Sequence, residues 1–197
     1  MAYSLVDPQP SGGKLPSLVH VELAALRAIR RYSAHSVVVD GARGLSHFGE
    51  HAAGWIALGL VGAAVDRTHR REWLATSVGA IGAHAAGVAV KRVVRRTRPL
   101  SDDLPPLART PSRLSFPSAH ACSTTAAAVA MTPMLGHRTS TGIAGAMALS
   151  RLLLGVHYPS DVAAGVAIGA TVGAVTRRLL ARNTPADGGP ADIGRRA

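Results

Sequence analysis

Several kinds of residue are scarce in this chain of 197 residues. A single cysteine, Cys122, excludes an intrachain disulfide. Aromatic residues make up only 4%, which is few for the stacking platforms of single-strand nucleic-acid binding. No carboxylate-rich cluster of the kind that holds hard cations is apparent. The first residues, MAYSLVDPQPSGGKLP, lack the charged-then-apolar pattern of a signal peptide. We therefore expect no metal ion, no other cofactor and no nucleic-acid partner.

What the chain has in excess is positive charge. The formal net charge is +11, with 22 basic residues of which only Lys14 and Lys91 are lysines. Such a charge suits a nucleic acid, an anionic membrane surface or a phosphorylated substrate.

Apolar stretches rich in Ala and Gly dominate the middle of the chain. A membrane span ordinarily needs roughly 17–25 residues, and four segments reach or approach that length: 51–65, 73–90, 117–136 and 161–176. A fifth, 139–156, is interrupted only by Arg151. Small residues in such segments permit close packing between membrane helices. The alternative is a soluble helical protein with buried Ala-rich helices.

The remaining segments complete the predicted organisation. Residues 17–32 have an apolar and a basic face, with Glu22 on the apolar one, and suit a membrane surface or helix packing better than spanning. The ends, 1–16 and 183–197, are rich in Pro, Gly and Asp, and we expect both to be flexible. We therefore predict an all-α, polytopic membrane helical bundle of five or six spanning helices over residues 17–182.

Counting spans predicts which polar segments share one side of the membrane. If 73–90 crosses the membrane, its end and the start of the span near Pro117 lie on the same side. The span from Pro117 leaves that side and 139–156 returns to it. Three clusters then meet at one face, namely KRVVRRTRP (91–99), PSAH (117–120) and SRLLLGVHYPSD (150–161).

The first two clusters favour an anion. Lys91 and Arg98 are seven residues apart, so they lie on one helix face if the helix continues to Pro99, and there they can bind a dianion. Alternatively, Arg92, Arg95 and Arg96 form an interfacial basic cluster for lipid headgroups. Ser118, Ala119 and His120 lie at a helix start, where free N–H groups favour an anion. A simple capped helix start is the alternative there.

The third cluster carries the strongest signal. Arg151 stands inside an otherwise apolar segment, where an arginine is costly and usually functional. His157 precedes a helix that begins at Pro159, and Asp161 falls in the first turn of that helix. A carboxylate can bind one ring nitrogen of a histidine and leave the other nucleophilic. Otherwise Asp161 merely complements the helix dipole and His157 is an unrelated loop residue.

Together the clusters contain the groups needed for phosphoryl transfer through a phosphohistidine. Lys91, Arg98 and Arg151 would stabilise the charge of the transferred phosphoryl group. His157 would attack phosphorus. His120 would protonate the leaving oxygen and then activate water.

The ordered set K-x6-RP (Lys91 to Pro99), PSAH and SR-x5-H-x3-D (Ser150 to Asp161) resembles the three-part signature of the type 2 phosphatidic acid phosphatase superfamily. The resemblance implies metal-independent catalysis and a helical core shared with vanadium haloperoxidases, with six spans usual in membrane members. It assigns the phosphate to Lys91, Arg98, Ser118, Ala119 and Arg151, acid catalysis to His120, nucleophilic attack to His157, and support of that histidine to Asp161. The second motif usually reads PSGH, so Ala119 departs from the pattern.

The resemblance also bears on the substrate. The compact Arg- and Ala-rich chain is similar to actinobacterial members that dephosphorylate decaprenylphosphoryl-5-phosphoribose in the synthesis of cell-wall arabinan precursors. We therefore predict a multi-pass cell-membrane enzyme that hydrolyses a phosphomonoester on a lipid-linked substrate, with membrane lipids around it and its site on the cytoplasmic side. Alternative substrates are polyprenyl diphosphate, phosphatidylglycerol phosphate and phosphatidic acid. A non-catalytic basic protein that binds membrane surfaces or nucleic acid is the alternative from a different class.

Two further features have competing explanations. HFGEH (47–51) matches the H-x-x-E-H pattern of some zinc peptidases, but Gly49 weakens a helix there and no third ligand stands out downstream. His84 lies among Ala and Gly in the middle of a predicted span, where we expect a packed or hydrogen-bonded histidine.

Overall fold

The computed structural model describes residues 17–182 and is helical throughout its regular structure. The predicted flexible ends, 1–16 and 183–197, lie outside the described residues. In chain order the elements are α1 (Leu18–Arg30), η1 (Arg31–Ala34), α2 (Ser36–Phe48), η2 (Glu50–Ala52), α3 (Ala53–Val65), α4 (Arg70–Val94), α5 (Ala119–Leu153) and α6 (Pro159–Arg182). The predicted all-α class is confirmed.

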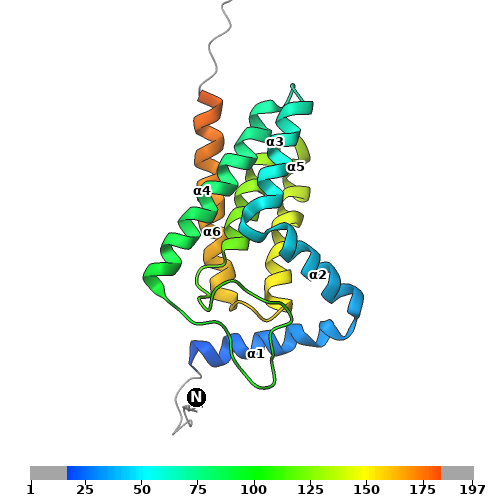
Figure 1. Ribbon diagram of the computed structural model, residues 1–197, viewed down its shortest axis with the longest axis vertical. Helices are drawn as coiled ribbons and strands as arrows, with labels where there is room; N and C mark the ends of the chain where they lie inside the picture. The colour runs from blue at the N-terminus through cyan, green and yellow to red at the C-terminus, as the bar shows by residue number, and fades with distance from the viewer. Residues whose placement is uncertain (1–16, 183–197) are drawn as a thin grey trace, which may run out of the picture.

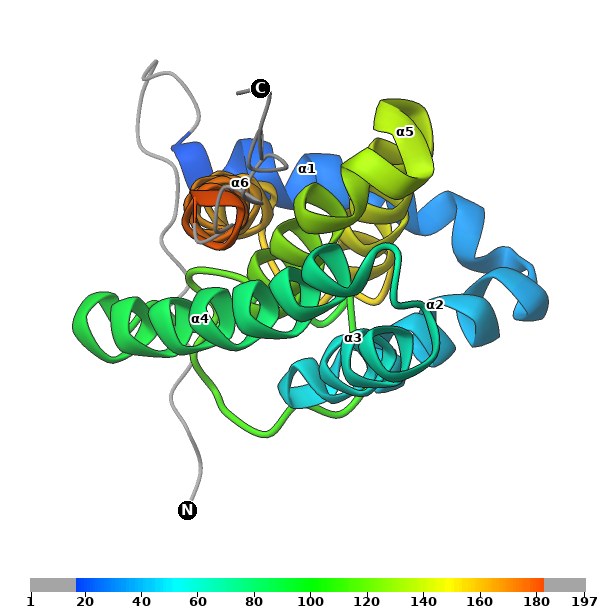
Figure 2. The ribbon, with the colours of Figure 1, turned by 90° about the horizontal axis from the view of Figure 1, so that it is seen from above.

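The helices form a bundle with one helix across its end (Figure 1). Helices α3 to α6 run along the long axis, with α4 at a slant to the others (Figures 1 and 2). Helix α1 lies across the end where α6 begins and contacts both α5 and α6. Only part of its apolar face packs against the bundle, because Leu26 is buried while Leu18 and Val21 are exposed.

Two helices, α4 and α6, are long and apolar enough to cross a membrane. A third candidate is the pair formed by α2 and the segment Glu50–Val65, which is bent by 52°. The sequence predicts no helix at residues 36–48 and predicts 51–65 as a span of its own. Helix α2 is not predicted because it contains no long apolar run: its buried Val39 and Ala42 are separated by the charged Asp40.

Helix α5 joins the two predicted segments 117–136 and 139–156 in one 35-residue element. A straight helix of that length would extend about 50 Å, yet His120 near its start and Arg151 near its end line the same cavity. The direction therefore reverses within α5. Gly136 provides the reversal with φ 77° and ψ 162°, a conformation that glycine adopts without steric cost. The two arms run antiparallel, as span counting predicted (Figure 1).

A stripe of glycines brings α6 against the first arm of α5. Gly165, Gly169 and Gly173 recur every fourth residue, and a Cβ on any of them would overlap backbone atoms of α5. For Gly165 the added atom would lie 2.7 Å from the carbonyl oxygen of Ser118. Small residues at this spacing let two helix backbones approach closely. The close approach places the start of α6 beside the start of α5, where Ser118 N–H donates to the carbonyl of Asp161 at 2.9 Å.

Candidate active site

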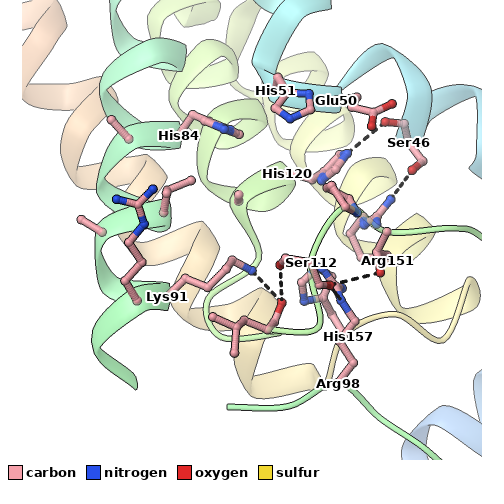
Figure 3. A pocket seen from close by; sticks show the side chains of 18 of the residues that line it. Ser46, Glu50, His51, His84, Lys91, Arg98, Ser112, His120, Arg151 and His157 are labelled. Atoms are coloured by element: carbon pink, nitrogen blue, oxygen red, sulfur yellow. Dashed lines mark hydrogen bonds between the residues drawn. The ribbon is translucent and has the colours of Figure 1, made fainter. Parts of the chain in front are cut away.

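The three polar clusters meet at a cavity of about 670 Å³ at the end of the bundle near α1 (Figure 3). The predicted site residues that line it are Lys91, Arg98, Ala119, His120, Arg151 and His157. They come from α4 and the loop after it, from the first turn of α5, and from the second arm of α5 and the connection to α6. The prediction of one continuing helix for Lys91 and Arg98 is wrong, because α4 ends at Val94 and Arg95 has a positive φ of 54°; the loop brings Arg98 to the cavity instead. Ser118 and Asp161 are fully buried behind this lining.

Ser118 begins α5 as its N-cap. Its Oγ accepts a hydrogen bond from the N–H of Ala121 at 3.4 Å, the contact expected of a capping serine. Ala119 follows on the cavity wall. The capped helix start is therefore real, and the same helix start faces the cavity.

Hydrogen-bond geometry determines the tautomer of His157. Its Nε2 lies 3.2 Å from Nη1 of Arg98, and a guanidinium can only donate, so Nε2 must accept. The proton of the neutral ring is then on Nδ1, which lies 3.6 Å from Oδ2 of Asp161. The lone pair on Nε2 is the nucleophilic one.

Burial, together with the positive charges of Arg98, Arg151 and Lys91, lowers the pKa of His157 well below its usual value. The ring is therefore neutral at physiological pH. Burial also lowers the pKa of Arg98, to about 10, which still leaves that guanidinium charged. The site thus pairs a neutral imidazole with a charged donor.

The cations of the cavity greatly outnumber its carboxylates. Among the described lining residues, Glu50 is the one acidic side chain, against the basic side chains Lys91, Arg92, Arg98, Arg109 and Arg151. Lys91 donates to the carbonyl of Leu114 at 3.0 Å. Arg151 is 1% exposed. Desolvated cations of this kind favour an anion with several oxygen atoms.

Two residues of the α2 region that sequence reasoning missed support this lining. Ser46 accepts hydrogen bonds from Nη1 of Arg151 at its Oγ (2.5 Å) and from Nε2 of His120 at its carbonyl (2.9 Å). Because a carbonyl only accepts, Nε2 of His120 carries a proton, and Nδ1 is the nitrogen left for proton transfer. At Gly49, an added Cβ would lie 2.9 Å from Cδ2 of His120.

A buried ionic network supports Asp161 from the side away from the cavity. Nη1 of Arg96 donates to Oδ1 of Asp161 at 3.0 Å, and Nη2 donates to Oε2 of Glu22 at 2.5 Å. The guanidinium also lies over the ring of Tyr158, 4.0 Å from its centroid. The guanidinium of Arg96 is therefore bound by protein groups, although its side chain is 23% exposed, which contradicts its assignment to lipid headgroups.

Glu22 completes this network from α1. It is 4% exposed, and its Oε1 accepts from both the N–H and the Oγ of Ser160, at 2.9 and 2.5 Å. Burial alone would raise the pKa of Glu22, but hydrogen bonds from Ser160 and Arg96 outweigh it and hold the pKa below its usual value. Glu22, the acidic residue on the apolar face of 17–32, thus pairs with Arg96 and Ser160 beneath the cavity. Its position was visible in the sequence, but its partner was not.

The H-x-x-E-H pattern does not converge on one point. The side chain of His47 is 90% exposed, whereas His51 lines the cavity. Within residues 17–182, no three His, Cys, Asp or Glu side chains are grouped closely enough to hold a metal ion. The geometry gives no support to the zinc-peptidase alternative.

A helical bundle with two or three candidate membrane spans and a cavity of clustered cations and histidines defines a helical membrane protein with a site for an anion. The family model of the PAP2 superfamily matches residues 72–185, and the chain belongs to this superfamily. The family predicted from the three motifs is thereby confirmed.

Known proteins agree with this membership. The chain is 58% identical over 134 residues to the decaprenylphosphoryl-5-phosphoribose phosphatase of Mycobacterium tuberculosis (strain CDC 1551 / Oshkosh), a match that covers 68% of this chain and 76% of that protein. It superposes on a transmembrane PAP2 type phosphatidylglycerolphosphate phosphatase from Bacillus subtilis with a TM-score of 0.66 at 21% identity, covering 82% of this chain and 87% of that one. A bacterial vanadium-dependent iodoperoxidase superposes with a TM-score of 0.69 at 18% identity, covering 88% of this chain and 52% of that one. At these identities the structural likeness concerns the fold.

Proposed function

We propose that this protein is a metal-independent membrane phosphatase that removes the phosphomonoester of decaprenylphosphoryl-5-phosphoribose through a phosphohistidine intermediate. The observation that carries the proposal is the Nε2 lone pair of His157, 3.2 Å from Arg98 in a cavity lined by three of the predicted phosphate-binding cations. A neutral imidazole beside desolvated cations is suited to attack an anionic phosphorus centre.

In the first step, Nε2 of His157 forms a bond to phosphorus as the bond to the ester oxygen breaks. With the anionic phosphate bound beside it, His120 carries a proton on Nδ1 as well as on Nε2, and it transfers the Nδ1 proton to the leaving alkoxide, which departs as the alcohol. Lys91, Arg98 and Arg151 stabilise the three equatorial oxygens, aided by the N–H groups at the start of α5. Asp161 stabilises the positive charge that forms on the His157 ring.

In the second step, water attacks phosphorus and its proton passes to Nδ1 of His120. The N–P bond breaks, the electron pair returns to His157, and inorganic phosphate leaves. Both steps use the groups already described in the cavity. They need no metal ion.

The substrate assignment rests on the relative with 58% identity, whose name specifies decaprenylphosphoryl-5-phosphoribose. The lining of the cavity is compatible with such a lipid. Next to its charged residues the cavity has an apolar lining on α4, formed by Ala85, Val88 and Ala89. A head group on the charged side and a lipid on the apolar side suit this division.

We further propose five membrane spans: the bent pair α2–α3, then α4, each arm of α5, and α6. Each arm is about half of the 35 residues of α5, at the lower limit for crossing a bilayer. Helix α1 lies at the interface on the side of the site, and we assign that side to the cytoplasm.

The decisive experiment replaces the nucleophile. We expect His157→Ala to abolish phosphate release in the presence of EDTA while the protein still inserts and folds. Wild type should be inhibited by vanadate, a phosphate analogue. The matched control is His137→Ala, an exposed histidine at the opposite end of the first arm, which should keep full activity. EDTA-resistant turnover by His157→Ala would overturn the mechanism.

A further inference from the structure

A second group of polar side chains lines the same cavity on the far side of His120 from His157. Glu50 and His51 come from η2, and His84 comes from α4. In Figure 3 the rings of His51 and His84 face each other across the cavity, with Glu50 beside His51. Their ring centroids lie 6.0 Å apart. We call Glu50, His51 and His84 the distal triad.

His84 is placed for contact with whatever the cavity holds. It precedes Lys91 by seven residues, so both lie on one face of α4, about 10 Å apart along the axis. Its Nδ1 is buried and has no hydrogen-bond partner among the described residues. Buried polar atoms are nearly always paired, and an ionisable residue within a span points to function. The unpaired Nδ1 can therefore form a hydrogen bond with a ligand in the cavity.

The backbone at His51 is held in an unfavourable conformation. His51 and Ala52 both have positive φ, 51° and 61°, a region that side chains with a Cβ rarely adopt. The turn is secured by a hydrogen bond of 3.1 Å from Ala52 N–H to the carbonyl of Gly49. Strain of this kind persists where the surrounding structure enforces it, and it clusters at ligand sites. Here it directs an imidazole into the cavity.

The position of the distal triad relative to the chemistry indicates its ligand. In-line displacement sends the leaving oxygen away from His157, toward His120. All of these histidines line the cavity, and in Figure 3 His120 lies between His157 on one side and His51 and His84 on the other. The carbon skeleton attached to the leaving oxygen therefore extends from His120 toward the distal triad. Two imidazoles and a carboxylate can donate to and accept from hydroxyl groups.

We propose that the distal triad is a subsite that hydrogen-bonds the hydroxyl groups of the alcohol carrying the phosphate, and so selects a sugar phosphate. This inference rests on the proposed phosphatase function and extends it to the basis of specificity. A diacylglycerol or polyprenyl leaving group would offer no hydroxyl to these polar groups and would leave the buried Nδ1 of His84 unpaired, which is how a site rejects an analogue that lacks hydroxyls.

The test compares two short-chain polyprenyl phosphoryl substrates, one with ribose 5-phosphate and one with 2,3-dideoxyribose 5-phosphate. Wild type should prefer the hydroxylated substrate by at least about tenfold in kcat/KM. His84→Leu should lower kcat/KM for that substrate about 10- to 100-fold and leave the dideoxy substrate within about twofold. His84→Gln, which can still hydrogen-bond, should recover part of the preference.

Two further variants separate recognition from structure. His51→Gly removes the imidazole but suits the positive φ, so it should reduce the preference without disturbing the fold. Val88→Ala lies on the same wall of the cavity without a polar atom, and should affect both substrates equally. An equal loss on both substrates in His84→Leu, or no loss on either, would overturn the subsite.

Assays of the wild-type enzyme distinguish a failure of the subsite from a failure of the phosphatase function. Hydrolysis of both substrates with no preference for hydroxyls refutes the subsite and leaves the phosphatase function intact. If wild type hydrolyses no lipid-linked phosphate in EDTA, the proposed function fails and the subsite with it.

Discussion

Ala119 and His120 occupy the first turn of α5, and neighbouring helices constrain them differently. Ala119 packs against α4, where a Cβ added to Gly87 would lie 3.7 Å from its methyl group. His120 is held by the carbonyl of Ser46, 2.9 Å from its Nε2. The methyl group at 119 thus contributes ordinary packing, whereas the imidazole at 120 is oriented by a hydrogen bond from another helix.

We expect Ala119→Gly to retain activity, because the backbone N–H that faces the cavity is unchanged. His120→Ala should lower kcat by about 10²- to 10⁴-fold, the usual contribution of a general acid. Both variants would be assayed by phosphate release under identical conditions. An increase of orders of magnitude in Ala119→Gly would instead identify a degenerate site and weaken the assignment as an enzyme.

Glu22 and Arg96 act through Asp161 and not on the substrate. Removing the charge of Glu22 leaves Arg96 with one carboxylate partner, and hydrogen bonds to charged groups are each worth about 1.5–3 kcal/mol. We expect Glu22→Gln to lower kcat severalfold with little change in KM, because the position of His157 changes and the phosphate ligands do not. Steady-state kinetics on purified enzyme separates the two parameters.

The same residue predicts a pH dependence of stability. The pKa of Glu22 is lower in the folded protein than in the unfolded chain, so its stabilising contribution is complete above about pH 5 and is lost as the pH falls through the folded pKa. Thermal unfolding should show this loss below about pH 4 in wild type and a smaller one in Glu22→Gln. Arg27→Ala is the control on α1, because its ion pair with Asp103 is exposed and surface pairs contribute little. An equal acid response in wild type and Glu22→Gln would refute this role.

Among the helices, the contact between α5 and α6 determines whether the site can assemble. It fixes the start of α6, and with it Asp161 and the preceding His157, against the start of α5. The glycine stripe of α6 makes this contact possible because carbonyl groups of α5 occupy the space that side chains would fill.

We therefore expect Gly169→Ala to lower both the melting temperature and the activity. Alanine is the better helix former by roughly 1 kcal/mol, but its Cβ would overlap the carbonyl of Cys122, and overpacking typically costs about 1–3 kcal/mol. Gly145→Ala on the second arm of α5 is the matched control, since nothing lies within 4 Å of its added Cβ. Thermal unfolding in detergent would compare them. Equal stability of the two variants would contradict the packing argument.

For the molecule in its membrane, the orientation of the site determines the side from which the substrate arrives. Positive residues flank both ends of the bundle, so the positive-inside rule favours neither orientation. We expect Ser101→Cys, in the loop beside the site, to be protected from an impermeant thiol reagent in intact cells. Thr68→Cys, in the exposed turn between α3 and α4 at the other end (Figure 1), should react. Cys122 is buried and contributes little background. The reverse labelling pattern would place the site outside the cytoplasm.

The helices at 17–32, 73–90 and 161–176, and both arms of α5, could be predicted because apolar runs and helix periodicity are local properties. The motif spacings likewise indicated Lys91, Arg98, His120, Arg151 and His157 as residues of the site. Span counting brought them to one face because the direction of the chain alternates at each crossing. Helix α2 could not be predicted in this way, since it is short and its apolar face is interrupted.

Local pattern therefore determined the helical class and the family motifs, since each depends on residues close together in the chain, and the alternating direction of the spans determined the shared face. The tertiary structure decided which side chains support the site. The partners of Arg96 lie 74 residues before it and 65 after it, at Glu22 and Asp161, and Ser46 meets Arg151 across 105 residues. Such contacts follow from how α1 and α2 pack against the bundle, and no local spacing encodes that packing.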